Sequence, residues 1–390
     1  MGKRWRRMRG RWLAASILAL LGVGAAAFAA YGASPEFART QEEWSRLRDN
    51  VIEYGELTDL VHEFNAMVQN NQYEYRKFRE DYGETNREVS EAYYDLAQDF
   101  YNDMSGESEA GSMIADLQLE IQAGNMLKQA DETLEDSRIY FLNFEMAECQ
   151  LTAAAQSDMI SFHRKKLEME QLRLNLDIAR WNQEQEQLRY GVGMSTGYNL
   201  LDVQQAVLQA EQDIAELETD LSNLRETLVV SLGWKHDDMP EIGEIPEVDM
   251  ERLERVNPDN QLDEAIENNY TLKINMRRLE NSSDQTVRES LESKISNNKT
   301  MIGAGISNAY KGLKSARLTY DKAAAEESLQ SETLRLAAVK RRAGQITEAE
   351  YYKQEYGVRQ AEIQRKMSSM TLFQALETYD WMVNGLAVAE

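Results

Sequence analysis

The chain has 390 residues, a formal net charge of −24 and a mean hydropathy of −0.60, with 28% charged and 8% aromatic residues and four prolines. So strong a negative charge argues against a nucleic-acid ligand, because phosphates require a basic surface. The low mean hydropathy excludes a compact core that surrounds most side chains. The scarcity of proline favours long helices and coiled coil.

The first 33 residues have the pattern of an export signal. Six basic residues between Lys3 and Arg11 precede an apolar stretch from Trp12 to Ala30, which is the order found in signal peptides. The stretch is also long enough to serve as a membrane anchor. The sequence therefore predicts an exported protein whose residues 1–33 are either cleaved or retained as an anchor.

Long helices are predicted for the part that follows. A short helical segment over 38–66 leads to an amphipathic helix that ends near Met104, and 105–111 form a turn. From Ser112 to Tyr190 the pattern is helical, and Gly124 is its one disturbance. Because an amphipathic helix of this length cannot bury its apolar stripe by itself, it is predicted to pack against partner helices.

A glycine-containing break follows Tyr190, and the helix after the break has a heptad pattern. Its apolar positions alternate at intervals of four and three: Val203, Val207, Ala210, Ile214, Leu217, Leu221, Leu224 and Leu228. Gly233 is predicted to end this helix. The region 233–260 holds Pro240, Pro246 and Pro258 and is predicted to be a linker.

The helical pattern resumes at Gln261 and continues to Leu279. A turn is predicted next, at either 280–286 or 296–300. A further helix reaches Arg342, and after a second break the last helix extends to about Gly385.

The two breaks belong to an internal repeat. A shift of 151 residues places Gly344 on Gly193 and Thr347 on Thr196. The same shift aligns Gln360, Ala361 and Glu362 with Gln209, Ala210 and Glu211. Each break has helix before and after it, so the chain contains two copies of one helical hairpin.

These patterns predict an all-α fold of long antiparallel coiled-coil hairpins in two tandem repeats, since no stretch alternates for long enough to form a strand. The first repeat is predicted at 34–232 and the second at 261–390. Gly193 and Gly344 can adopt positive φ at the end of the incoming helix. Thr196 and Thr347 can cap the outgoing helix. The two hairpin tips are therefore expected side by side at one end of a bundle, as a shared docking surface.

The segments RYGVGMSTGYNLLDVQQAVLQAEQDI, LRETLVVSLGW and RRAGQIT resemble the TolC family of outer-membrane efflux proteins. The resemblance covers about residues 60–385. It implies a homotrimer that closes into a hollow α-barrel, and a periplasmic adaptor (membrane fusion) protein that binds the tips and serves an ABC-type or other inner-membrane exporter. Arg341 and Arg342 depart from the family pattern, in which an aromatic residue is usual. The matching docking positions are Tyr190, Gly193, Ser195, Thr196, Gly344, Ile346 and Thr347.

Family members that cross an outer membrane insert two β-strands between the helices of each repeat. The connections here, at 105–111 and at 280–286 or 296–300, are too short for strands that span a bilayer, which need about 9–11 residues each. The sequence therefore predicts a TolC-like variant that lacks the β-barrel strands. We expect it in the cell envelope, on the extracytoplasmic face of the membrane, spanning a cell wall and not an outer membrane.

The sequence does not predict an enzyme, a cofactor or a metal site. His62, His163 and His236 occur singly, which does not support a metal site or an acid–base pair. The glycines at 191 and 193 follow a helix, whereas a dinucleotide-binding loop follows a strand. The single cysteine, Cys149, excludes a disulfide framework within one chain.

Two other interpretations remain at this stage. One is an exported, elongated coiled coil that acts as a structural or scaffold protein at the cell surface. The other is an adaptor, which should carry β-rich domains that the sequence does not predict. The duplicated hairpin favours the duct, because a simple spacer has no need of it.

Overall fold

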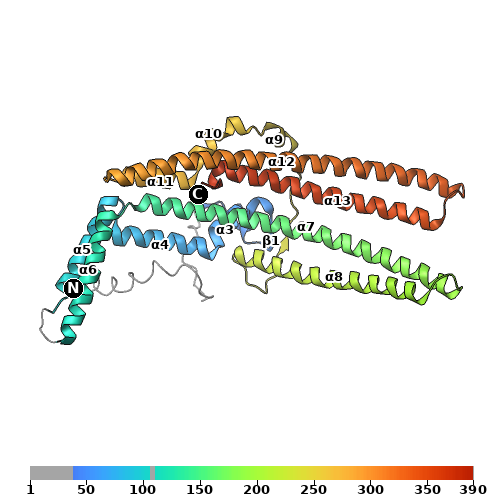
Figure 1. Cartoon of the computed structure of the whole chain (residues 1–390), viewed down its shortest axis with the longest axis horizontal. Helices are drawn as coiled ribbons and strands as arrows, with labels where there is room; N and C mark the ends of the chain where they lie inside the picture. Colours follow the sequence, from blue (N-terminus) through green and yellow to red (C-terminus); the bar gives the residue numbers. More distant parts are fainter. Residues whose placement is uncertain (1–37, 106–109, 390) are drawn as a thin grey trace. The chain divides into compact units, whose positions relative to one another are not determined.

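The computed structural model describes residues 38–105 and 110–389, so the predicted export signal at 1–33 lies outside the described residues. Apart from one parallel pair of two-residue strands, the regular elements in these ranges are helical, which confirms the all-α class. The chain divides into two compact units, each formed by segments that are distant in sequence. Figure 1 shows the long helices that dominate both.

The first unit takes its described residues from Gln69–Glu145 and Ile274–Lys294. Its elements are most of α4 (Ala66–Tyr82), all of α5 (Asn86–Asn102) and α6 (Ala110–Glu132), the start of α7 (Ser137–Gly191), most of α11 (Tyr270–Asn281) and the start of α12 (Gln285–Arg342). Stacked aromatic rings hold α4 against α7, with the centroids of Phe78 and Tyr140 3.8 Å apart.

Gly83 ends α4 within a segment that the sequence predicts as one helix up to Met104, so that prediction is wrong. Gly83 has a φ of 90°, and its N–H donates to the carbonyl oxygen of Arg79 at 3.1 Å. Thr85 then caps α5: its hydroxyl accepts from the N–H of Glu88, whose carboxylate accepts from the N–H of Thr85. This capping box starts a new helix directly after the glycine.

A second break separates α6 from α7, which corrects the predicted continuous helix from Ser112 to Tyr190. Gly124 lies inside α6 and does not interrupt it. The cause is Asp136, which is fully buried and accepts from the N–H of Ile139 at 2.9 Å, capping α7. Its other oxygen accepts from Arg277 Nε at 2.6 Å, so the turn is fixed by a contact with α11.

Between these breaks, α5 and α6 form a helical hairpin. Of the predicted turn at 105–111, residues 106–109 lie outside the described residues, and α6 already begins at Ala110. Small side chains line the interior of the hairpin, so the backbones approach closely. Ser90 Oγ donates to the carbonyl oxygen of Ala130 at 2.8 Å, and Asn86 Nδ2 donates to that of Thr133 at 2.9 Å. The buried residues between the two helices are Val89, Ala97, Ala123 and Ala130.

The second unit takes its described residues from 38–68, Met146–Lys273 and 295–389. Its elements are α2 (Gln41–Leu47), β1 (Val51–Ile52), η2 (Tyr54–Glu56), α3 (Leu57–Phe64), most of α7, α8 (Gly197–Ser231), β2 (Glu241–Ile242), α9 (Met250–Arg255), α10 (Pro258–Asn268), most of α12, α13 (Glu348–Trp381) and η3 (Met382–Leu386). The predicted helical segment at 38–66 is therefore interrupted by β1. An apolar core joins these parts, with Tyr54 packed edge-on against Phe373 at 5.1 Å.

The segment after α8 is held by β1 and α3. Gly233, with a φ of 90°, ends α8 as predicted, and a Cβ there would lie 2.6 Å from Cβ of Phe64. Within 233–260, β2 pairs in parallel with β1, with Ile52 opposite Ile242. The proline-containing segment thus packs against the core of this unit.

The heptad seam of α8 is confirmed. All eight predicted positions are buried or half-buried, and Val207, Leu217 and Leu228 are the most buried. Ion pairs beside the seam join α8 to α7, with Lys165 Nζ 2.8 Å from Asp220 and Arg180 Nη2 2.9 Å from Glu211.

In the second half, the predicted helix at 261–279 is broken at Asn269, between α10 and α11. The side chain of Asn269 is buried and donates to the carbonyl oxygen of Ala387 at 2.8 Å, so a distant contact fixes the kink. The following turn lies between Asn281 and Gln285, which selects 280–286 over 296–300, a segment inside α12.

Candidate functional site

The first hairpin tip is a Schellman motif that ends α7. Gly193 has a φ of 76°, and its N–H donates to the carbonyl oxygen of Tyr190 at 3.0 Å. The N–H of Met194 reaches the carbonyl oxygen of Arg189 at 2.7 Å. These two bonds satisfy carbonyls that the end of a helix otherwise leaves unpaired.

The second tip repeats the motif bond for bond at the end of α12. Gly344 has a φ of 69° and donates to the carbonyl oxygen of Arg341 at 3.0 Å, and Gln345 donates to that of Lys340 at 2.9 Å. The predicted positive φ of both glycines is therefore correct.

The predicted threonine caps are also present. Thr196 Oγ1 accepts from the N–H of Asn199 at 3.3 Å and begins α8. Thr347 Oγ1 accepts from the N–H of Glu350 at 3.2 Å, and the Glu350 carboxylate accepts from the N–H of Thr347 at 2.8 Å. The backbone hydrogen bond from Thr347 holds the pKa of Glu350 below its ordinary value.

Both tips lie at the same end of their helices. Trp181, late in α7, stacks on Tyr352, early in α13, with ring centroids 5.1 Å apart. Tyr356 donates its hydroxyl to Asn175 Oδ1 at 2.8 Å, one turn further from the tips. Figure 1 shows the α7–α8 and α12–α13 connections at one common end of these four helices.

Replacing Gly193 by alanine is expected to lower the free energy of unfolding by about 1 kcal/mol, because alanine is strained at positive φ. No described atom lies within 4 Å of the position that the new Cβ would take, so strain acts without a clash. Gly191→Ala is the matched control: Gly191 is helical and equally open, so alanine should stabilise by about 0.5–1 kcal/mol. Urea denaturation followed by circular dichroism measures both, and effects of the same sign would contradict this interpretation of the turn.

The first tip presents an apolar surface that the sequence motif did not predict. Around the predicted Tyr190, large side chains are between 50% and 79% exposed: Leu188, Tyr190, Val192, Met194, Tyr198 and Leu201. The predicted Ser195 is half-buried and donates its hydroxyl to the Glu186 carboxylate. The sequence does contain a signal for this apolar surface, because no residue from Tyr190 to Leu201 is charged.

The second tip presents a charged surface. Lys340, Arg341 and Arg342 lie at the C-terminal end of α12, where cations favour the helix dipole. Arg341 pairs with Glu348 at 2.7 Å, and its guanidinium lies 4.4 Å from the centroid of the Tyr351 ring. The predicted Ile346 is half-buried. The two tips therefore share a backbone but differ in surface chemistry.

A second, uncovered stripe runs along α8, which we call the outer seam of α8. Each residue of this stripe comes two positions before a residue of the buried heptad seam. Two positions correspond to a rotation of about 200° around the helix axis, so the stripe lies on the opposite face. Its members are all exposed and all uncharged: Leu201, Gln205, Leu208, Gln212, Ala215, Thr219 and Ser222.

α12 has a corresponding stripe, the outer seam of α12. Its members are exposed and repeat at intervals of four and three: Leu318, Lys322, Ala325, Leu329, Glu332, Leu336 and Val339. Apolar heptad stripes that face water normally mark contacts with another helix.

Two of the three histidines have structural contacts. His163 is buried, and its Nε2 lies 2.8 Å from the carbonyl oxygen of Gly243, beside β2. His62 Nδ1 lies 2.7 Å from Glu148 Oε1. Within the described residues, no group of three or more His, Cys, Asp or Glu side chains is placed to hold a metal ion.

The two histidines should give opposite pH dependences of stability. Burial lowers the pKa of His163, so its contribution is full above the ordinary pKa of 6.5 and is lost as the pH falls. The hydrogen bond to Glu148 raises the pKa of His62, so its contribution is full below 6.5 and is lost as the pH rises through the folded value. Urea denaturation between about pH 5 and 8 should show that His163→Gln reduces the rise of stability with pH and that His62→Gln increases it. Changes of the same sign in both variants would contradict these pKa shifts.

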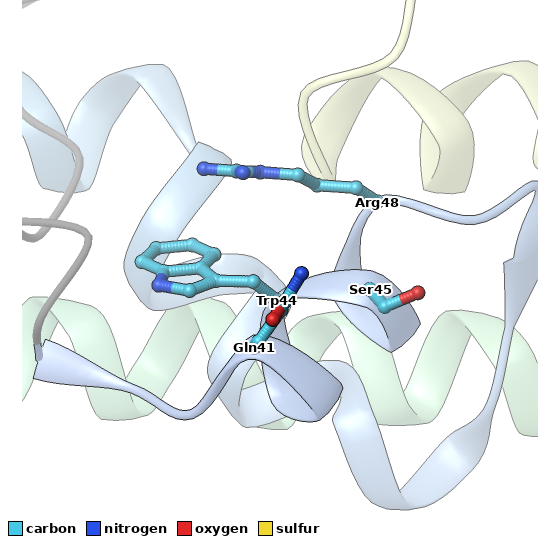
Figure 2. A pocket seen from close by; sticks show the side chains of 4 residues that line it. All are labelled: Gln41, Trp44, Ser45 and Arg48. Atoms are coloured by element: carbon cyan, nitrogen blue, oxygen red, sulfur yellow. The ribbon is translucent and has the colours of Figure 1, made fainter.

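A cavity of about 410 Å³ lies beside α2, lined by Gln41, Trp44, Ser45 and Arg48 (Figure 2). The Arg48 guanidinium lies over the Trp44 ring, 4.4 Å from its centroid. This lining contains no carboxylate, thiol or imidazole, so it offers no acid–base pair and no activated nucleophile.

The chain is similar in fold to solved structures of two outer-membrane channels and one outer membrane protein. The Campylobacter jejuni CmeC outer membrane channel aligns with a TM-score of 0.53 at 9% identity, covering 94% of each chain. The outer-membrane channel OprN aligns with a TM-score of 0.51 at 11% identity, covering 94% of this chain and 99% of that chain. The outer membrane protein VceC from Vibrio cholerae aligns with a TM-score of 0.51 at 7% identity, over 85% of this chain and 96% of that chain.

The chain therefore has a TolC-like fold, as its sequence motifs predict. No family model matches the sequence, and no curated protein sequence matches it. Among the described helices, none combines the length and the apolar character that crossing a membrane requires.

Proposed function

We propose that the chain is the exit duct of a tripartite efflux or export system, a passive conduit that binds an adaptor at its hairpin tips. The observation that carries this proposal is the pair of matching tips at one end of a fold shared with outer-membrane channels. A spacer gains nothing from two tips that repeat each other bond for bond. A duct, in contrast, needs repeated tips at the end where it binds its partner.

The duct is proposed to be a homotrimer. The outer seams of α8 and α12 differ in composition, and a contact between unlike surfaces joins copies head to tail and can close a ring. The outer seam of α8 is uncharged, so it can pack on the leucines of the outer seam of α12 without adding a charge to Lys322 and Glu332, which that seam already contains.

The tips are the proposed docking site for an adaptor-like protein, with Gly193, Thr196, Gly344 and Thr347 fixing the turns and the exposed side chains around Tyr190 making contact. An ABC-type or other inner-membrane exporter would supply the energy of transport. We place the duct in the cell envelope, on the extracytoplasmic side and across a cell wall, with residues 1–33 either cleaved or kept as an anchor.

Native mass spectrometry of the full chain in detergent tests the assembly. A trimer is the expected result. A monomer or a dimer would instead favour the exported coiled-coil scaffold, which has no use for a closed ring.

Photocrosslinking in cells tests the docking site. A photoreactive residue in place of Met194 or Gln345, both exposed at the tips, is expected to give a covalent product with a membrane-attached protein that contains a helical hairpin. Lys299, exposed on α12 away from the tips, is the matched control position. No product at either tip, or an equal product at Lys299, would overturn the docking proposal.

A further inference from the structure

The two hairpin tips can be compared position by position, because the 151-residue shift places equivalent residues on the same backbone turn. Tyr190 in the first tip corresponds to Arg341 in the second, and Gly191 corresponds to Arg342. The backbone hydrogen bonds of the two turns match, so the turn itself does not require the arginines. The basic residues of the second tip therefore need another explanation.

One basic residue is common to both tips, but only the first copy has an acidic partner for it on the same helix. Arg189 pairs with Glu186 at 3.7 Å. The shift places Lys340 on Arg189 and Ala337 on Glu186, and Ala337 is buried and uncharged. The charge that is compensated in the first tip is therefore left uncompensated by α12 in the second.

The carboxylates of the second tip are already bound to other groups. Glu348 pairs with Arg341 at 2.7 Å. The Glu350 carboxylate accepts from the backbone N–H at the start of α13 at 2.8 Å. Across 38–105 and 110–389, no carboxylate forms an ion pair with Lys340 or Arg342. Both side chains are exposed, so two positive charges remain available to a partner.

Neighbouring basic residues elsewhere in this unit have acidic partners. Lys165 Nζ lies 2.8 Å from Asp220, and Lys166 Nζ lies 3.8 Å from Glu244. The second tip differs from that pattern in a chain whose formal net charge is −24. An anionic partner is attracted to this tip and repelled by the acidic surface elsewhere, which orients its approach.

We infer that the protein bound at the tips presents carboxylates to the second tip and apolar side chains to the first. Lys340 and Arg342 form charge-assisted hydrogen bonds with the carboxylates. Tyr190 and Met194, which are 50% and 79% exposed, pack against the apolar side chains. The inference rests on the proposed docking function and adds the chemistry of the partner, a segment with an acidic face beside an apolar one.

The charges of the second tip favour a protein over an anionic lipid surface. Glu348 and Glu350 are exposed at the same tip as the basic residues. A planar layer of anionic headgroups would approach these carboxylates together with the cations and be repelled by them. A protein segment can instead contact the end of α12 alone, where the uncompensated charges lie.

Photocrosslinking of the full chain in cells tests the inference, with the photoreactive residue at Met194, outside the charges that change. Lys340→Glu combined with Arg342→Glu places like charges opposite the partner, so the yield of the product is expected to fall about tenfold or more. Lys340→Arg combined with Arg342→Lys keeps both charges and should keep the product. Lys235→Glu combined with Lys299→Glu is the matched control: both residues are exposed away from the tips, and the net charge changes equally.

Mass spectrometry of the product from a photoreactive residue at Gln345 gives a second test that needs no charge variant. The expected product joins this tip to a peptide rich in Asp and Glu. A joined peptide without carboxylates, an unchanged yield after charge reversal, or an equal fall in the control pair would overturn the acidic partner and leave docking intact. A lipid in the product would overturn it in favour of a membrane surface. No product from either tip would remove the docking proposal, and this inference with it.

Discussion

Leu208→Glu is expected to separate the assembled copies. Leu208 is exposed in the single chain and lies in the middle of the uncharged outer seam of α8. If this seam packs on the leucines of the outer seam of α12 of the next copy, the new carboxylate is buried against apolar side chains. Removing its hydration costs about 3 kcal/mol per contact, which weakens each contact about 100-fold. Sedimentation velocity should show the trimer replaced by folded monomers.

Gln209→Glu is the matched control for this substitution. Gln209 is the next residue on α8, is also exposed, and lies outside the outer seam. Gln209→Glu adds the same negative charge as Leu208→Glu, and glutamate has almost the same shape as the glutamine it replaces. The variant should therefore remain trimeric. If both variants kept the trimer, or both lost it, the outer seam of α8 would not be the contact.

Asp136→Ala is expected to lower the free energy of unfolding by about 2–3 kcal/mol. The substitution removes the cap on α7, which contributes about 1 kcal/mol. It also leaves Arg277 and Asn281 without the buried acceptor they share, which lies 2.6 Å and 3.0 Å away. The Arg277 side chain is 36% exposed and also pairs with Glu280, so solvent compensates part of its lost charge, and the two unmet donors add about 1–2 kcal/mol. Urea denaturation followed by circular dichroism measures the loss.

Glu135→Ala is the neighbouring control. Glu135 pairs with Arg278 at 2.9 Å, but both side chains are about one third exposed, so the loss should be about 0–1 kcal/mol. Asp136→Asn should fall between the two, because the amide oxygen still caps Ile139 while the charge is gone. If Asp136→Ala proved no costlier than Glu135→Ala, the burial of this turn would not explain the break between α6 and α7.

The tips were predictable because their chemistry is local. A glycine at positive φ and a threonine three residues later determine both turns through bonds that span a few residues, and the 151-residue shift shows them twice. The heptad seam of α8 was predictable for a similar reason, since its period is visible in the sequence itself. The break at Gly83 was equally local: the glycine and the capping box of Thr85 and Glu88 were visible in the sequence, but the prediction overlooked them.

The breaks at Asp136 and Asn269 depend on distant residues. Asp136 is held by Arg277, 141 positions away, and Asn269 by Ala387, 118 positions away. No local pattern reveals such partners. The choice between the two turn sites in the second repeat depends on one local and one distant contact. Asp284 caps α12 through the N–H of Val287 at 2.9 Å, three residues on, whereas Asn298 is buried inside α12 and bonded to Ala389, 91 positions away.

The apolar surface of the first tip and the outer seams were harder to predict. Periodicity identifies apolar stripes, but whether a neighbouring helix covers a stripe depends on the packing of the whole unit. On α12, Lys322 and Glu332 also interrupt the stripe, so its sequence resembles an ordinary solvated face. Only the exposure of Leu318, Leu329 and Leu336 distinguishes it.

Imaging of the assembled full chain by electron cryomicroscopy, at a resolution that traces helices, tests the duct most directly. The expected result is three copies around an open axis, with the α7–α8 and α12–α13 connections of every copy at one end. A centre filled with side chains, or tips divided between opposite ends, would contradict it.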